Sequence, residues 1–284
     1  MKKNTRFAVL SILVFLILAV AFLADKIVPC DPLSASLSDA FQAPGKDHYF
    51  GTDALGRDVF SRVICGATTS VYSVLILVAV ILVVGTFLGI IAGYFGGVAD
   101  AVIMRVGDMM IAFPDLILAM AIAGILGPSL KNSMIAIAAV SWTRYARLSR
   151  SLVLKIRNRT YISAAEISGS RHSRILRRYM LPNALPTMII TAATDIGTIM
   201  LSLASLSFLG FGIQPPTPEW GYMLSEGRTY ILSSPWLLFC PGLAVFITVV
   251  IFNLWGDCIR DMIDPNATEK RRKKRRKRTW MEKN

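Results

Sequence analysis

Long apolar runs separated by polar segments dominate the chain. The first run, residues 7–24, carries no charged residue and is long enough to cross the hydrocarbon core of a bilayer. Five further spans are predicted at residues 70–95, 102–126, 133–148, 184–212 and 236–255. The runs are continuous rather than alternating, which is typical of helices and not of a β-barrel. The pattern therefore predicts an all-α membrane protein with six transmembrane helices.

The third, fourth and fifth spans contain charged residues, the fifth only Asp195. In the third span, Arg105 and Asp108 are three residues apart, so they can pair on one helix face. The same span has a break at Pro114. The fourth span requires Arg144 and Arg147 to extend their charged ends to the membrane interface.

The polar segments predict helix starts and close helix packing. Between the first two spans lies a proline-containing extramembrane segment, in which Thr52 or Asp53 is expected to cap a short interfacial helix. In the second span, glycines recur at four-residue spacing, at Gly85, Gly89 and Gly93. Small residues on one helix face allow another helix to approach closely in lipid.

A basic segment of about 20 residues precedes the fifth span and is predicted to form two short helices broken at Gly169. In the first helix, four residues share a face, and two adjacent alanines leave room there for another protein surface: Tyr161, Ala164, Ala165 and Ser168. The second helix has an arginine stripe opposite an apolar stripe. Pro182 and Pro186 are expected to interrupt the entry into the fifth span. Such a hairpin suits a membrane face that holds a soluble partner.

Composition and charge agree with a membrane protein. The chain is 54% hydrophobic, with mean hydropathy +0.54, which excludes an ordinary soluble domain. Most of its 31 lysines and arginines fall on one side if the N-terminus is cytoplasmic. That orientation places the basic hairpin in the cytoplasm. Residues 266–284 are expected to form a disordered polybasic cytoplasmic tail that contacts lipid headgroups rather than nucleic acid.

The chain lacks the sequence patterns of an enzyme. No glycine-rich phosphate loop occurs, and no nucleophile and base are arranged for catalysis. The four cysteines have no C-x-x-C spacing, so no metal site is predicted, and a disulfide between Cys30 and Cys65 is only a possibility. The chain is therefore expected to bind no cofactor, and any ATP would be used by a separate subunit.

Two sets of residues carry a resemblance to a known family. The spacing of the basic hairpin resembles the EAA loop of ABC importer permeases, with Ser163 at the usual glutamate position and the remaining matches at Ala164, Ala165, Gly169, Leu181 and Pro182. Residues 50–62 resemble the FGTD-x-x-GRD-x-x-SR signature of the dipeptide, oligopeptide and nickel branch. Residues 206–212, 214–216, 219–221 and 261–265 are also similar to that branch. The resemblance covers about residues 1–265.

The resemblance implies a type I ABC importer permease fold in a bacterial inner membrane. Residues 1–68 would form an N-terminal transmembrane helix and extracellular segment, and residues 69–265 the core permease domain, with a cytoplasmic coupling loop at about 150–182. The implied partners are a second permease in a heterodimer, two ATPase subunits, an extracellular substrate-binding protein and the lipid bilayer. The matched hairpin residues, Ser163 included, would couple to the ATPase. The implied cargo is nickel or a di- or oligopeptide.

The residues alone leave other functions open. An ion-gradient-driven secondary transporter would show an inverted repeat and paired broken helices, and no convincing repeat is visible. A non-transporting membrane scaffold is the third class. Asp195 lies among threonines within the fifth span, where an ionisable group faces a cavity or a partner. Asp195 is therefore the first candidate for lining a translocation pathway, followed by Asp108 and Asp115.

Overall fold

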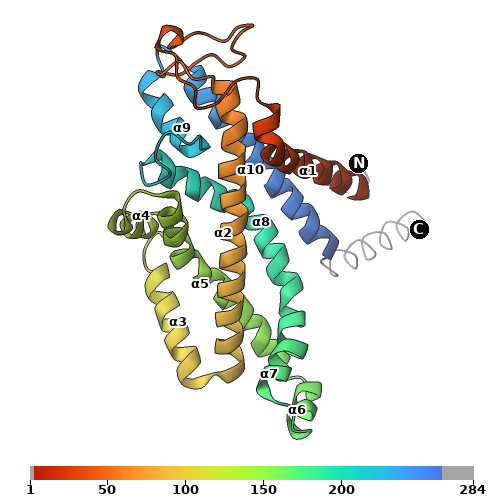
Figure 1. Cartoon of the computed structure of the whole chain (residues 1–284). Helices are drawn as coiled ribbons and strands as arrows, with labels where there is room; N and C mark the ends of the chain where they lie inside the picture. The colour runs from red at the N-terminus through yellow and green to blue at the C-terminus, as the bar shows by residue number, and fades with distance from the viewer. Residues whose placement is uncertain (1–2, 264–284) are drawn as a thin grey trace, which may run out of the picture.

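The computed structural model describes residues 3–263, and the regular elements in that range are helices (Figure 1). The long helices are α1 (Lys3–Ile27), α2 (Val59–Phe95), α5 (Leu130–Arg157), α8 (Leu181–Phe208) and α10 (Trp236–Ile263). The shorter elements are η1 (Leu37–Asp39), α3 (Gly97–Ile111), α4 (Asp115–Leu126), α6 (Thr160–Ile167), α7 (His172–Ile175), the π-helical turn η2 (Leu176–Met180), α9 (Trp220–Gly227) and η3 (Arg228–Tyr230). The predicted all-α class is confirmed. The tail predicted at 266–284 lies outside the described residues.

Four described helical segments are long and apolar enough to cross a membrane: α1, α2, α10 and the continuous unit α7–η2–α8. A fifth candidate is the pair α3 and α4, which meet at 96°. The break that the sequence places at Pro114 within the third span is therefore confirmed. Pro114 explains the break, because proline lacks a backbone N–H and disfavours helical geometry in the residue before it. The count of six spans and the cytoplasmic N-terminus stay predictions.

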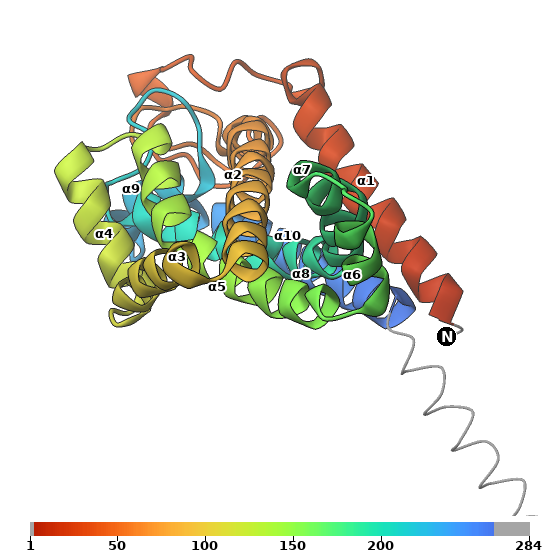
Figure 2. The same cartoon turned by 90° about the horizontal axis from the view of Figure 1, so that it is seen from below.

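Helix α2 runs along most of the length of the molecule (Figure 1). It has 37 residues, which corresponds to a length of about 55 Å at the helical rise per residue. Seen from below in Figure 2, α3 and α4 lie to one side of α2, while α6 and α7 lie to the other. One end of α2 therefore meets the extramembrane loops, and the other end meets the basic hairpin.

The regularly spaced glycines of α2, at 85, 89 and 93, pack closely against another helix, as their spacing predicts, and that helix is α5. A Cβ added at Gly89 would lie 2.3 Å from the backbone oxygen of Ala146, and one at Gly85 would lie 2.4 Å from the Cβ of Tyr145. Since real Cβ atoms do not approach so closely, these positions require glycine for the observed helix contact.

The start of α2 differs from the sequence prediction. The helix begins at Val59, and Asp58 is its cap, because a carboxylate oxygen of Asp58 accepts from the Ser61 backbone N–H at 2.8 Å. The expected cap at Thr52 or Asp53, with a separate interfacial helix, is wrong. The Thr52 hydroxyl donates to the backbone carbonyl of Asp39, and Asp53 pairs with an arginine.

The fifth span also begins differently from the prediction. The chain continues without interruption from α7 through η2 into α8, so Pro182 and Pro186 do not break it. Pro182 lies in the first turn of α8, where the missing backbone N–H of proline is tolerated. The π-helical turn η2 directly before α8 accommodates the local change in the backbone hydrogen-bond pattern. The basic hairpin is thus continuous with a membrane span.

Candidate functional site

The basic hairpin, residues 160–182, lies at the far end of the molecule from the extramembrane loops (Figure 1). Helix α6 ends at Ile167, and the chain turns at Gly169, where the sequence places a break and where φ is +74°. The Ser170 N–H donates to the Ala165 carbonyl at 3.0 Å, and the Gly169 N–H donates to the Glu166 carbonyl at 3.0 Å. This pair of bonds is a Schellman motif, which turns the chain sharply after a helix.

The two faces of α6 have different surroundings. Ile162 and Ala165 are buried, whereas Tyr161 is 44% and Ile167 88% exposed. Ala164 is exposed as well. The prediction that both alanines share an exposed face is therefore wrong, because consecutive helical residues point about 100° apart. The free face is formed instead by the side chains at 161, 164 and 167.

A small hydrophobic cluster fixes the hairpin to the ends of α2 and α5. Its buried members are Ile90, Tyr94, Val153, Ile162, Ile175 and Met180. They come from α2, α5, α6, α7 and η2. Of the two residues that end the EAA-like spacing, Leu181 packs partly buried against this cluster, and Pro182 is exposed. The hairpin is therefore packed against these helices and is not a loose loop.

Polar contacts reinforce this attachment. The Tyr94 hydroxyl lies 2.8 Å from Nδ1 of His172 and 3.3 Å from a carboxylate oxygen of Glu166. Ser163, which stands where the resemblance expects glutamate, is exposed. Glu166 thus provides a carboxylate about one turn further along α6. The sequence pattern gives no signal for Glu166 and Tyr94, because only their contact in the fold indicates a role.

Three arginines at three-residue spacing on α5 each pair with an aspartate of another helix. Arg144 Nη1 lies 3.1 Å from Asp195 of α8. Arg147 Nη2 lies 2.5 Å from Asp108 of α3. The third pair, also at 2.5 Å, joins Arg150 to Asp100. These pairs connect α5 to both α3 and α8.

The candidate pathway residues Asp108, Asp195 and Asp115 differ in whether they form ion pairs. The expected pair of Arg105 with Asp108 is wrong, because Asp108 contacts Arg147 across the helix interface. Asp195 is buried and pairs with Arg144 of α5. A neighbouring helix thus provides the partner that an ionisable residue within a membrane span requires. Asp115 is exposed in the first turn of α4 and does not join them.

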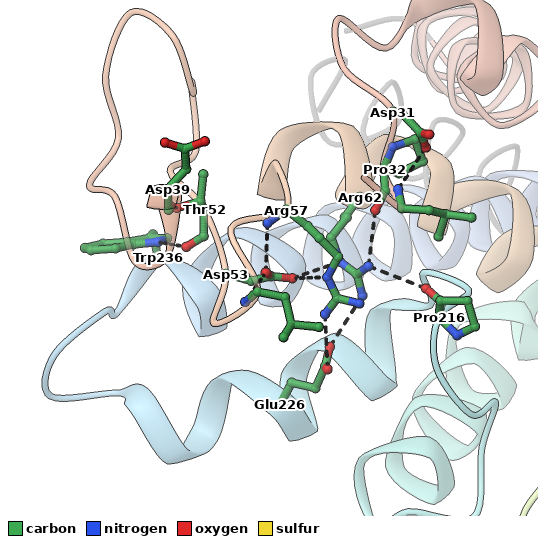
Figure 3. A network of polar contacts seen from close by, with 12 residues as sticks. Asp31, Pro32, Asp39, Thr52, Asp53, Arg57, Arg62, Pro216, Glu226 and Trp236 are labelled. Carbon is green, nitrogen blue, oxygen red and sulfur yellow. Dashed lines mark hydrogen bonds and ion pairs between the residues drawn. The ribbon is translucent and has the colours of Figure 1, made fainter. Parts of the chain in front are cut away.

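At the opposite end, a buried ionic cluster joins α2 to α9 (Figure 3). Arg57 Nε lies 2.6 Å from Asp53 Oδ2. One nitrogen each of Arg57 and Arg62 lies 3.4 Å from the Glu226 carboxylate. Arg62 is 1% exposed and also donates to the backbone carbonyls of Pro32 and Pro216. Residues of the 50–62 signature therefore link the loop at Pro32, the loop at Pro216 and helix α9 at Glu226.

A second set of contacts attaches α9 to α2. The Glu219 carboxylate caps α9 by accepting from the backbone N–H groups of Gly221 and Tyr222, at 2.9 and 2.8 Å. The Trp220 indole N–H donates to the Val63 carbonyl at 2.8 Å. Burial raises the pKa of Glu219, and the backbone N–H groups oppose this rise. The 219–221 residues thus have a structural role at this end.

Comparison with known proteins identifies the family. The family model described as "Binding-protein-dependent transport system inner membrane component" matches residues 85–269. The chain belongs to this family of ABC transporter permeases.

Similar permeases carry different substrate names. The chain is 42% identical over 257 residues to the probable D,D-dipeptide transport system permease protein DdpC of Escherichia coli K12, covering 90% of this chain and 86% of that protein. It is 40% identical over 255 residues to the nickel transport system permease protein NikC of the same strain, covering 90% and 92%. A glutathione transport system permease protein, GsiD of Pectobacterium atrosepticum, is 40% identical over 253 residues, covering 89% and 84%.

The fold also matches a solved permease structure. A chain of the MetNI methionine ABC transporter, in an inward-facing conformation, aligns with a TM-score of 0.57 at 17% identity, covering 72% of this chain and 98% of that one. This likeness shows the type I importer permease fold. Helix α2 of this permease runs between the ionic cluster at one end and the basic hairpin at the other. Among the described residues, no group of three or more His, Cys, Asp or Glu side chains is placed to hold a metal ion.

Proposed function

We propose that this permease forms half of the translocation pathway of an ATP-driven importer for nickel or for di- or oligopeptides. A second permease would complete the pathway as a heterodimer. Two ATPase subunits and an extracellular substrate-binding protein would complete the transporter, a multi-pass assembly of the bacterial inner membrane. The substrate names of the similar permeases support these substrate classes.

The observation that carries the proposal is an exposed helix face on a firmly anchored hairpin. Tyr161, Ala164 and Ile167 are exposed on α6, while its other face packs on the cluster at the ends of α2 and α5. A partner bound to the exposed face would move both helices at once. The ATPase would therefore act through residues 163–182 on α8, which continues from the hairpin without a break.

Within this proposal the EAA-like residues have separate tasks. Ser163 and Ala164 are exposed and would contact the ATPase. Ala165 packs inward, and Gly169 turns the chain. Leu181 and Pro182 begin α8 and would transmit the movement to the span.

Reconstitution of the complete transporter in proteoliposomes tests the proposal. We expect uptake that requires ATP and the binding protein, and that persists when an ionophore removes ion gradients. Uptake that needs a gradient and no ATPase would assign a secondary transporter, and absence of uptake by a fully assembled complex would assign a scaffold. Parallel assays with radioactive nickel and a labelled dipeptide decide the substrate.

A further inference from the structure

Four arginines around η2 have no acidic partner among the described residues. Together with Ser173, they line a single surface pocket: Arg171, Arg174, Arg177 and Arg178. All four are exposed, and none forms an ion pair with another described residue. The arginines of α5 at 144, 147 and 150 are each paired with an aspartate. The pocket therefore offers concentrated positive charge to an anion from outside the chain.

An apolar groove adjoins this pocket. It lies between α2 and the unit α7–η2–α8, and most of its lining is aliphatic or aromatic: Leu82, Val83, Phe87, Ile91, Leu181 and Leu185. Ser173 and Arg177 line both the groove and the basic pocket. Val83 is 65% and Phe87 62% exposed. The groove thus runs from the arginines along the apolar surface of a candidate membrane span.

We propose that the groove and the pocket together bind one anionic phospholipid, with an acyl chain along α2 and the phosphate among the arginines. Arginine binds phosphate oxygens through several N–H donors, and basic residues at a membrane surface attract anionic lipids. The inference goes beyond the proposed function, and it holds whichever side of the membrane this end faces.

The combination of features favours a lipid over a protein partner. An acidic protein surface would pair with the arginines and leave the apolar groove on α2 unfilled. A helix of a second permease would fill the groove and leave the guanidinium groups without an anion. An amphiphile with a phosphate at one end satisfies both halves, which share Arg177, with a single ligand. Protein ligands would require two of the partners proposed above, the ATPase at the arginines and the second permease in the groove.

Native mass spectrometry of the full chain, purified with its co-purifying subunits, tests the proposal. Phosphatidylglycerol and phosphatidylcholine with identical acyl chains are the probes. We expect phosphatidylglycerol to bind about tenfold more tightly. Both lipids carry the phosphate, but the choline ammonium of phosphatidylcholine cancels its net charge and is repelled by the arginines. Arg177→Gln should remove this preference. Arg105→Gln, which changes an exposed arginine of α3 that has no ion pair with a described residue, should leave it intact.

A second variant tests the groove without changing charge. Val83→Trp should fill the groove and reduce retention of both lipids, with an unchanged melting temperature as the control for folding. Equal binding of the two lipids, or equal effects of Arg177→Gln and Arg105→Gln, would overturn the proposal. Displacement of the lipid by inorganic phosphate at equal concentration would assign a free-phosphate site instead. Loss of lipid only when partner subunits assemble would assign a subunit interface.

Discussion

Tyr94 and His172 meet at 2.8 Å, although 78 residues separate them in the chain. Tyr94 lies in the last turn of α2, and His172 begins α7. Their rings also contact edge-on, with centroids 5.7 Å apart. Helix α2 is thus attached to the basic hairpin, through which we propose that the ATPase acts.

Removal of the Tyr94 hydroxyl should loosen this attachment. Tyr94→Phe keeps the ring in the hydrophobic cluster but loses the contacts with His172 and Glu166. We expect a loss of about 0.5–1.5 kcal/mol in stability and a lower ratio of substrate transported to ATP hydrolysed. Simultaneous transport and hydrolysis assays give this ratio. An unchanged ratio would show that the hydroxyl is not part of the coupling.

Gly169 should tolerate asparagine better than valine. A Cβ at this position meets no atom within 4 Å, so the constraint is the positive φ and not space. Gly169→Val should cost about 1–2 kcal/mol in the hairpin and reduce recovery of the ATPase with the permease, with membrane insertion intact. Gly169→Asn should retain most of the ATPase, because asparagine adopts this conformation more readily. Equal recovery with both variants would contradict the role of the bend.

The Arg144–Asp195 pair should respond asymmetrically to mutation. The Asp195 side chain is 7% exposed and that of Arg144 66%, so Arg144→Gln leaves a buried carboxylate without its cationic partner. We expect Arg144→Gln to lower stability by about 1–3 kcal/mol and Asp195→Asn to cost less. The double variant should be more stable than Arg144→Gln alone, as measured by thermal unfolding in detergent.

Uptake by Asp195→Asn separates a structural role from a pathway role. If Asp195 only connects α8 to α5, the neutral variant should transport normally. A large loss of uptake in a stable, fully assembled complex would place its charge in the pathway.

Arg62 should not be replaceable by lysine. Its guanidinium contacts Asp53, Glu226 and two backbone carbonyls, and lysine has fewer donors and no planar fork. Arg62→Lys should cost about 1–3 kcal/mol, seen as a lower thermal midpoint of the purified complex. Arg105→Lys is the control with the same chemical change at an exposed position. Equal midpoints for the two variants would rule out a stabilising role for the ionic cluster.

The apolar pattern predicts much of the fold because burial and membrane insertion depend on side-chain polarity. The spacing of Gly85 and Gly89 was sufficient to predict a close helix contact, although not that α5 is the partner. The 96° bend between α3 and α4 was not predicted, since Pro114 marks a break but fixes no angle.

The polar contacts of the candidate site were the least predictable part. Asp108 has an arginine three residues away on its own helix, yet it pairs with Arg147 of α5 because packing brings that group closer. Similarly, the orientation of α6 depends on which alanine the cluster around Ile162 buries. Such choices follow from tertiary packing, which a single sequence does not specify.

Thiol labelling of Ala164→Cys tests the central claim most directly, in a background where the partly exposed Cys30 and Cys240 are changed to serine. A membrane-impermeant reagent should label this cysteine in inverted vesicles but not in intact cells, and assembly with the ATPase should protect it. Labelling in intact cells, or labelling that the ATPase does not slow, would contradict a cytoplasmic hairpin that holds the ATPase.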